Sequence, residues 1–156
     1  MTIAPERVTT DRKKGRHLVT PELFEKLSAY VEKHQSVTRP YAESVIEQTL
    51  VWLNACAENP TVRLGMSDSV DPGWHAFILH SQEYTAFCQE QFGRYFHHVP
   101  PAPGNVMDAE TIARTLPVMY ASGYEVEESF WTGALYPCCP PNPCVAAAEN
   151  DEEDVS

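Results

Sequence analysis

Four of the six histidines lie within 24 residues of one another, and an aspartate precedes them in the same stretch. Asp71 and His75 are four residues apart, the spacing that places two side chains on one face of a helix. A turn at Gly93 would bring an extended segment with two adjacent histidines back toward that face. Imidazole nitrogens and carboxylate oxygens are ligands for Zn(II) and Fe(II). The sequence therefore predicts a candidate metal site made from Asp71, His75 and one of the pair His97 and His98.

Other features of this cluster favour a structural role as the alternative. Asp71 also fits the N-cap of the predicted helix, where its carboxylate would accept a backbone N–H, and the positive end of a helix repels cations. Because His97 and His98 are adjacent, they point to opposite sides of an extended segment, and only one of them faces the site. On this alternative, His75 and His98 hydrogen-bond to Asp71 or to the backbone and hold the exit segment against the helix.

A second group of candidate ligands lies near the C-terminus, where prolines surround Cys138, Cys139 and Cys144. Thiolates bind Zn(II) and Cu(I), but this spacing differs from the paired cysteines of structural zinc sites. A reversible disulfide between Cys144 and either Cys138 or Cys139 imposes fewer geometric requirements than a metal site does. Two further alternatives are a proline-rich tail with incidental thiols and a precursor that is modified at these cysteines. Cys56 and Cys88 fall on apolar helix faces and are expected in the core.

Capped and periodic segments predict the helices that must position these side chains. Thr20 and Thr38 are N-caps followed by prolines, and the helices that they open run to about residues 34 and 57. A third helix is expected over residues 71–92, ended by Gly93 in the left-handed conformation. A fourth is expected over residues 108–122. Four helices with no clear strand and no internal repeat predict an all-α fold, a small helical bundle.

The charge is uneven along the chain and suggests the domain boundaries. Eight of the eleven Lys and Arg lie in residues 1–39, whereas the C-terminal residues are mostly acidic. We expect residues 1–19 to be a disordered basic arm and residues 20–131 to be the helical domain. We expect residues 132–156 to be a largely flexible tail, rich in proline, cysteine and acidic side chains.

The composition also narrows the class of partner. A chain of 156 residues with 43% hydrophobic residues suits one domain with its own core. The net charge of −11 opposes contact with a phosphate backbone, so nucleic acid is not expected as a partner. There is no apolar run of membrane-spanning length and no signal-peptide pattern, so we expect a soluble cytoplasmic protein without a membrane partner.

A distinctive combination of acidic, aromatic, histidine and cysteine residues begins at Val70. It consists of Val70-Asp71, Trp74-His75, Ile78-Leu79-His80, Tyr84, Phe87-Cys88, Phe92-Gly93 and His97-His98-Val99-Pro100, followed by Arg114-Thr115-Leu116, Gly123-Tyr124 and Trp131. This combination resembles the glycine-rich domain-containing protein-like family. The resemblance implies no catalytic roles, because that family is largely without an assigned biochemical activity. The chain departs from the family's name, since it has seven glycines and no glycine-rich tail.

No nucleophile with a neighbouring base, phosphate-binding loop or dedicated acid–base pair is recognisable, so the sequence identifies no enzyme activity. The expected function is a small helical module that binds a protein or small-molecule ligand through an aromatic surface, with Zn or Fe as its candidate cofactor. The alternatives are a metal-dependent enzyme, a thiol-based redox protein or metal carrier, and the modified precursor. The residues expected to form the aromatic surface are Trp74, Tyr84, Tyr95 and Phe96.

Overall fold

The structure is a computed structural model that describes residues 11–99 and 109–132. The described residues are helical and contain no strand, which confirms the all-α prediction. The elements in chain order are the 3-10 helix η1 (Gly15–Leu18) and the α-helices α1 (Pro21–Gln35), α2 (Arg39–Glu58), α3 (Asp71–Leu79), α4 (Ser81–Phe92), α5 (Ala109–Ala121) and α6 (Ser129–Thr132).

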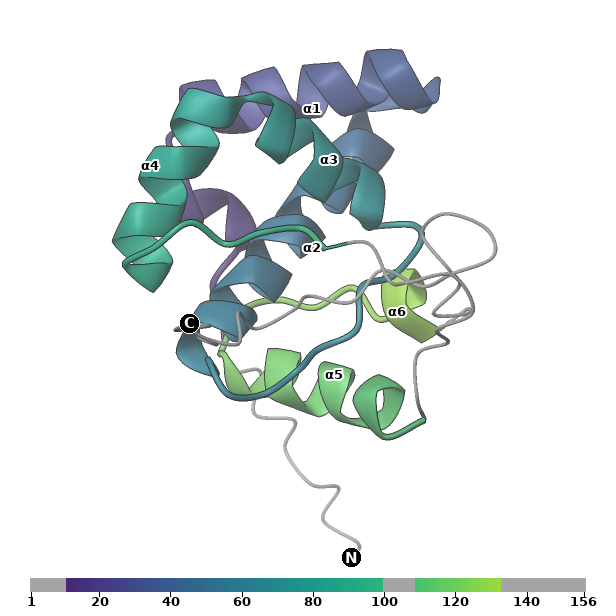
Figure 1. Cartoon of the computed structure of the whole chain (residues 1–156). Helices are drawn as coiled ribbons and strands as arrows, with labels where there is room; N and C mark the ends of the chain where they lie inside the picture. Colours follow the sequence, from purple (N-terminus) through teal and green to yellow (C-terminus); the bar gives the residue numbers. More distant parts are fainter. Residues whose placement is uncertain (1–10, 100–108, 133–156) are drawn as a thin grey trace, which may run out of the picture.

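Helix α2 is the central element of the bundle. Its residues from Gln48 to Cys56 are all buried, so most of its circumference is covered by other elements. Figure 1 shows α1, α3 and α4 on one side of α2 and α5 on the other, and α2 contacts each of these helices. The indole of Trp52 in α2 lies 4.8 Å from the indole of Trp74 in α3, and both side chains are fully buried. Helices α2 and α3 therefore share one aromatic core.

The starts of α1 and α2 follow the predicted capping chemistry. The Thr20 hydroxyl accepts a hydrogen bond from the Leu23 backbone N–H at 3.2 Å, and the Thr38 hydroxyl accepts one from Tyr41 at 3.4 Å. Each cap is followed by a proline in the first turn, where no intrahelical N–H donor is needed. These two boundaries are confirmed within one or two residues of the predicted ones.

The single helix expected over residues 71–92 is wrong, because the chain breaks at His80 into α3 and α4. His80 has φ −83° and ψ 65°, outside the helical region, and its ring Nδ1 donates to the Ala76 carbonyl at 2.7 Å. The Tyr30 ring of α1 packs edge-on against His80 at 5.5 Å. A local hydrogen bond and a tertiary ring contact thus accompany the corner, and no glycine or proline marks it in the sequence.

Residues 11–19 also differ from the expected disordered arm. The backbone of Lys13 pairs with the segment after α5, through Lys13 N–H to Gly123 O at 3.2 Å and Glu125 N–H to Lys13 O at 2.8 Å. Gly15 is buried against α2, where a Cβ would lie 2.5 Å from the Glu47 carbonyl oxygen. The Arg16 guanidinium donates to the Glu47 carboxylate at 2.6 Å. The folded domain thus begins before residue 20.

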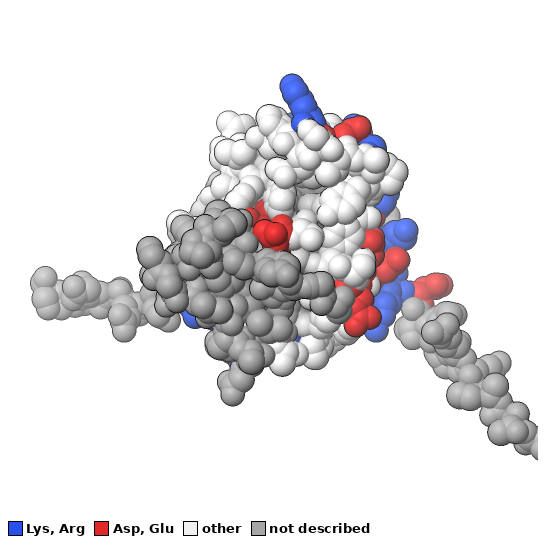
Figure 2. Space-filling model, turned by 90° about the vertical axis from the view of Figure 1, so that its right-hand side faces the viewer, with Lys and Arg blue, Asp and Glu red and all other residues white. Residues whose placement is uncertain are grey.

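Several charged side chains of the described surface form ion pairs. Arg39 bridges the carboxylates of Glu25 and Glu32, and Lys26 in α1 pairs with Glu83 in α4 at 2.9 Å. Figure 2 shows charged side chains of both signs gathered along one side of a face that also carries a broad area without Lys, Arg, Asp or Glu. Exposed pairs of this kind contribute little individually to stability. The core therefore carries most of the folding free energy.

The two cysteines expected in the core, Cys56 and Cys88, are both buried and carry free thiols. The predicted cap at Asp108 lies outside the described residues. The thiol cluster of Cys138, Cys139 and Cys144 lies outside them as well. Among the described helices, none is both long enough and apolar enough to cross a membrane.

Replacing Gly73 by alanine is expected to destabilise the fold by about 1–3 kcal/mol, measured by urea unfolding. Gly73 lets α3 approach α2 closely, since a Cβ there would overlap Thr49 Oγ1 and lie 2.9 Å from Val45 Cγ1. This cost opposes a gain of about 1 kcal/mol in helix propensity. The double variant with Thr49→Ala should be more stable than the sum of the two single changes. A Gly73→Ala variant as stable as the parent would show that the helices are not this close.

Candidate metal centre

Three side chains from two segments converge at the N-terminal end of α3. Asp71 is the first residue of that helix, and His75 lies one turn later on the same face. His98 comes from the extended segment that follows α4. The left-handed Gly93, with φ 72°, ends α4 and turns the chain into that segment, as the sequence predicted. The structure therefore brings together Asp71, His75 and His98 from the predicted set.

The donor atoms lie close together. His75 Nε2 lies 3.0 Å from Asp71 Oδ2, and His98 Nε2 lies 3.0 Å from Asp71 Oδ1. The two imidazole nitrogens are also 3.0 Å apart. Each Nε2 has only one in-plane site, which is either a proton or a lone pair. Consequently, when both imidazoles donate to an ionised carboxylate, their two N–H groups lie against each other in an unfavourable contact.

Asp71 is not the helix N-cap that the sequence suggested. Val70 holds the N-cap position, and no side chain caps α3. The Asp71 side chain is 3% exposed, and its two oxygens face His75 and His98 instead of the helix N–H groups. The objection that capping already occupies this carboxylate therefore does not apply.

The neighbouring histidines have different surroundings, as alternation in an extended segment requires. The His98 side chain is 10% exposed and stacks on the Trp74 indole, with ring centroids 4.0 Å apart and planes 17° apart. His97 is exposed, and its ring lies 4.6 Å from the Tyr95 ring. Of the predicted pair, His98 joins the cluster and His97 does not.

The chemistry of the three side chains narrows the candidate ligand set. They provide two imidazoles and one carboxylate whose ligand atoms all lie within 4.8 Å of one another. Two histidines and one carboxylate are the ligand set typical of non-haem Fe(II), and the same donor types bind Zn(II).

The predicted aromatic surface is wrong for three of its four members. Trp74 and Tyr84 are fully buried and Phe96 is 6% exposed, so they are core residues, and only Tyr95 is partly exposed. Their role in the structure is to fix the segment that carries His98. The aromatic periodicity of these residues is visible in the sequence. Their mutual contacts are not, because Tyr84 reaches Trp74 only when the helix is broken at residue 80.

Tyr84 links the two segments that carry the candidate ligands. The Trp74 indole N–H donates to the Tyr84 hydroxyl at 3.0 Å, and that hydroxyl donates to the Phe96 carbonyl at 2.5 Å. Burial raises the pKa of the Tyr84 phenol well above its ordinary value, so the hydroxyl stays protonated and remains a donor. Trp74 precedes His75 in the chain and Phe96 lies two residues before His98. One buried hydroxyl thus ties both sides of the cluster to the core.

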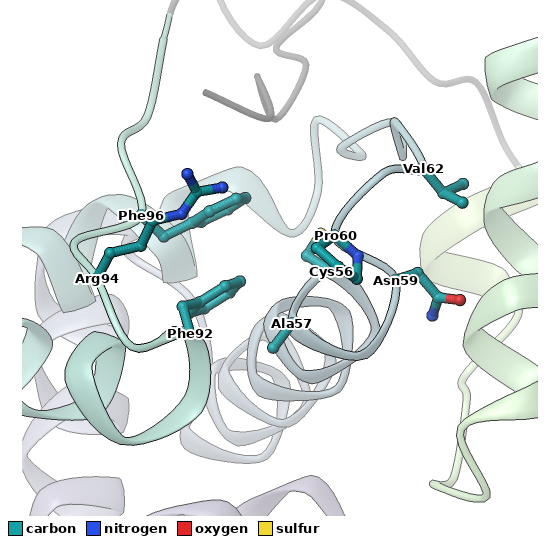
Figure 3. Close-up of a pocket in the computed structure, with 8 residues that line it drawn as sticks. All are labelled: Cys56, Ala57, Asn59, Pro60, Val62, Phe92, Arg94 and Phe96. Atoms are coloured by element: carbon teal, nitrogen blue, oxygen red, sulfur yellow. The ribbon is translucent and has the colours of Figure 1, made fainter. Parts of the chain in front are cut away.

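A separate cavity of about 140 Å³ lies between the end of α2 and the segment after α4. Figure 3 shows the Phe92 and Phe96 rings on one wall and Cys56 and Pro60 on the other, with Arg94 beside Phe96. Burial raises the pKa of the Cys56 thiol, which keeps it protonated and a poor metal ligand. Phe96 also packs 5.8 Å from Trp74, so this cavity borders the aromatic layer beneath His98.

Tyr84→Phe is expected to lower the free energy of unfolding by about 1–3 kcal/mol, because it leaves the Phe96 carbonyl and the Trp74 indole without their partner. Tyr30→Phe is the matched control, since the Tyr30 contacts given by the structure are ring contacts with His34 and His80. Urea unfolding of both variants measures the difference. Equal stability of the two variants would contradict a structural role for the Tyr84 hydroxyl.

Comparison with known proteins identifies a family for this chain. A sequence profile described as UCP032817-like matches residues 15–115, which include all three residues of the cluster. No curated protein and no solved structure matches this chain. Because the match covers well over half of the sequence, the chain belongs to the UCP032817-like family.

Proposed function

We propose that this protein is a helical module that binds one divalent transition-metal ion through Asp71, His75 and His98. The observation that carries the proposal is the convergence of the three side chains, in which each imidazole Nε2 lies 3.0 Å from one Asp71 oxygen and 3.0 Å from the other Nε2. Hydrogen bonds from both imidazoles to the carboxylate leave their N–H groups in an unfavourable contact, whereas a cation bound by both nitrogens and the carboxylate would remove it. The buried carboxylate supports the same interpretation, because an ionised group at 3% exposure needs a compensating charge.

The chemistry of the donors limits the metal. Two imidazoles and a carboxylate suit Zn(II), Fe(II) and similar ions, and the set contains no thiolate that would select Cu(I). The stacked Trp74 ring and the Tyr84 hydrogen bonds fix the orientation of the His98 segment before an ion binds. We therefore propose Fe(II) or Zn(II) as the bound metal.

The resemblance to the glycine-rich domain-containing protein-like family supports a role for the same residues, since its pattern includes Asp71, His75 and the His97-His98 pair. It adds no activity to the proposal. The partner that we propose is a protein or a small molecule in the cytoplasm, because the net charge of −11 opposes nucleic acid.

Protein purified without a metal-affinity tag should bind close to one equivalent of Fe(II) or Zn(II) per chain, measured by elemental analysis and calorimetric titration. Saturation at about 100 times the dissociation constant should stabilise the fold by about 2.7 kcal/mol and raise its melting temperature. Asp71→Asn, His75→Ala and His98→Ala should each lower the affinity at least about tenfold.

His97→Ala is the matched control, since it removes the adjacent histidine that lies outside the cluster and should bind metal like the parent. Protons compete with metals for imidazole nitrogens, so acidification to about pH 5 should release the ion. Metal that stays bound to the His75→Ala variant would contradict the proposed site. A melting temperature that no divalent metal changes would contradict metal binding altogether.

A further inference from the structure

We infer that the cavity between the end of α2 and the segment after α4, shown in Figure 3, binds a small carboxylate whose apolar part is about the size of one benzene ring. The inference goes beyond the proposed function and does not rest on it, because none of the three candidate metal ligands lines this cavity.

The size of the cavity limits the ligand. Its volume is about 140 Å³, which is close to the roughly 150 Å³ of an engineered protein cavity that binds benzene. A single six-membered ring therefore fills a space of this size, and a second fused ring needs more room than the cavity offers.

Two opposite walls of the cavity are apolar. The rings of Phe92 and Phe96 form one wall, stacked on each other with centroids 4.4 Å apart and planes 6° apart. Cys56 and Pro60 lie opposite them (Figure 3). Because burial raises the pKa of the Cys56 thiol, this side chain stays neutral and behaves as a small hydrophobic group. These walls favour a hydrocarbon ring over a polar ligand of the same size.

Arg94 supplies the charge that selects a carboxylate. It is the only charged side chain among the described residues that line the cavity, and it lies beside the Phe96 ring (Figure 3). A guanidinium carries five N–H donors in a planar fork, so a carboxylate can be added to the contacts that Arg94 already makes. The net charge of −11 opposes anions over the molecule as a whole, so binding of a carboxylate depends on this local positive charge.

The test is an NMR titration of the full chain with benzoate in the presence of EDTA, which keeps the metal site empty during the measurement. The methyl signals of Ala57 and Val62, which line the cavity, should shift to saturation. Benzoate should bind at least about tenfold more tightly than benzamide, which has the ring without the charge, and than acetate, which has the charge without the ring. 2-Naphthoate should bind at least about fivefold more weakly than benzoate, because its second ring overfills the cavity.

Arg94→Gln should lower the affinity for benzoate at least about tenfold and leave the affinity for benzamide within about twofold, since only the charge-dependent contact is lost. Arg63→Gln is the matched control, because it removes the same charge from an exposed side chain next to Val62 that does not line the cavity. It should leave both affinities within about twofold. Retained binding of benzamide to the Arg94→Gln variant shows that its cavity is intact.

The remaining outcomes overturn the inference. Benzoate that shifts no methyl signal of the cavity residues contradicts a ligand site there. Equal affinities for benzoate and benzamide, or an equal loss of benzoate affinity in Arg94→Gln and Arg63→Gln, contradict the role of Arg94. An affinity that rises from benzoate to 2-naphthoate contradicts the size limit. Because every titration uses metal-free protein, none of these results bears on the proposed metal site.

Discussion

The burial of the Asp71 carboxylate is the constraint on which the rest of this structure depends. At 3% exposure the group has lost almost all of its water, and an ionised carboxylate without compensation costs several kcal/mol in such a place. The fold supplies two imidazoles, one from the next turn of α3 and one from a segment 27 residues along the chain. The contacts of α3 with α2 at Gly73, and of the exit segment with Trp74, hold that arrangement in place.

The corner at His80 makes this convergence geometrically feasible. A continuous helix over residues 71–92 would be about 33 Å long and would carry its far end away from Asp71. Because the chain bends between α3 and α4, Tyr84 faces Trp74 across the corner, and its hydroxyl reaches the Phe96 carbonyl. The aromatic residues of this stretch therefore serve to define the path of the backbone as well as to fill the core.

Local chemistry made part of this structure predictable. The Thr20 and Thr38 caps, the left-handed Gly93 and the buried Cys56 and Cys88 all follow from residue type and spacing. The corner at His80 could not be predicted in this way, because its contacts are with Tyr30 and Ala76 and no helix-breaking residue marks it.

The candidate site shows the same division. The pairing of Asp71 with His75 follows from a four-residue spacing on one helix, so it was visible in the sequence. The choice between His97 and His98 depends on which imidazole stacks on Trp74, which the sequence leaves open. The predicted aromatic surface was wrong because hydrophobic periodicity identifies the apolar face of a helix. It does not show whether that face packs in the core or binds a ligand.

The three ligands therefore differ in how firmly the fold places them. Asp71 and His75 keep their relative position for as long as α3 is helical, with or without an ion. His98 depends on the turn at Gly93, on the stacking with Trp74 and on the hydrogen bond from Tyr84 to Phe96. An ion that joins all three cross-links α3 to the exit segment and opposes the separation of the two. The affinity of the proposed site would consequently depend more on the path of residues 93–98 than on the helix that supplies two of the three candidate ligands.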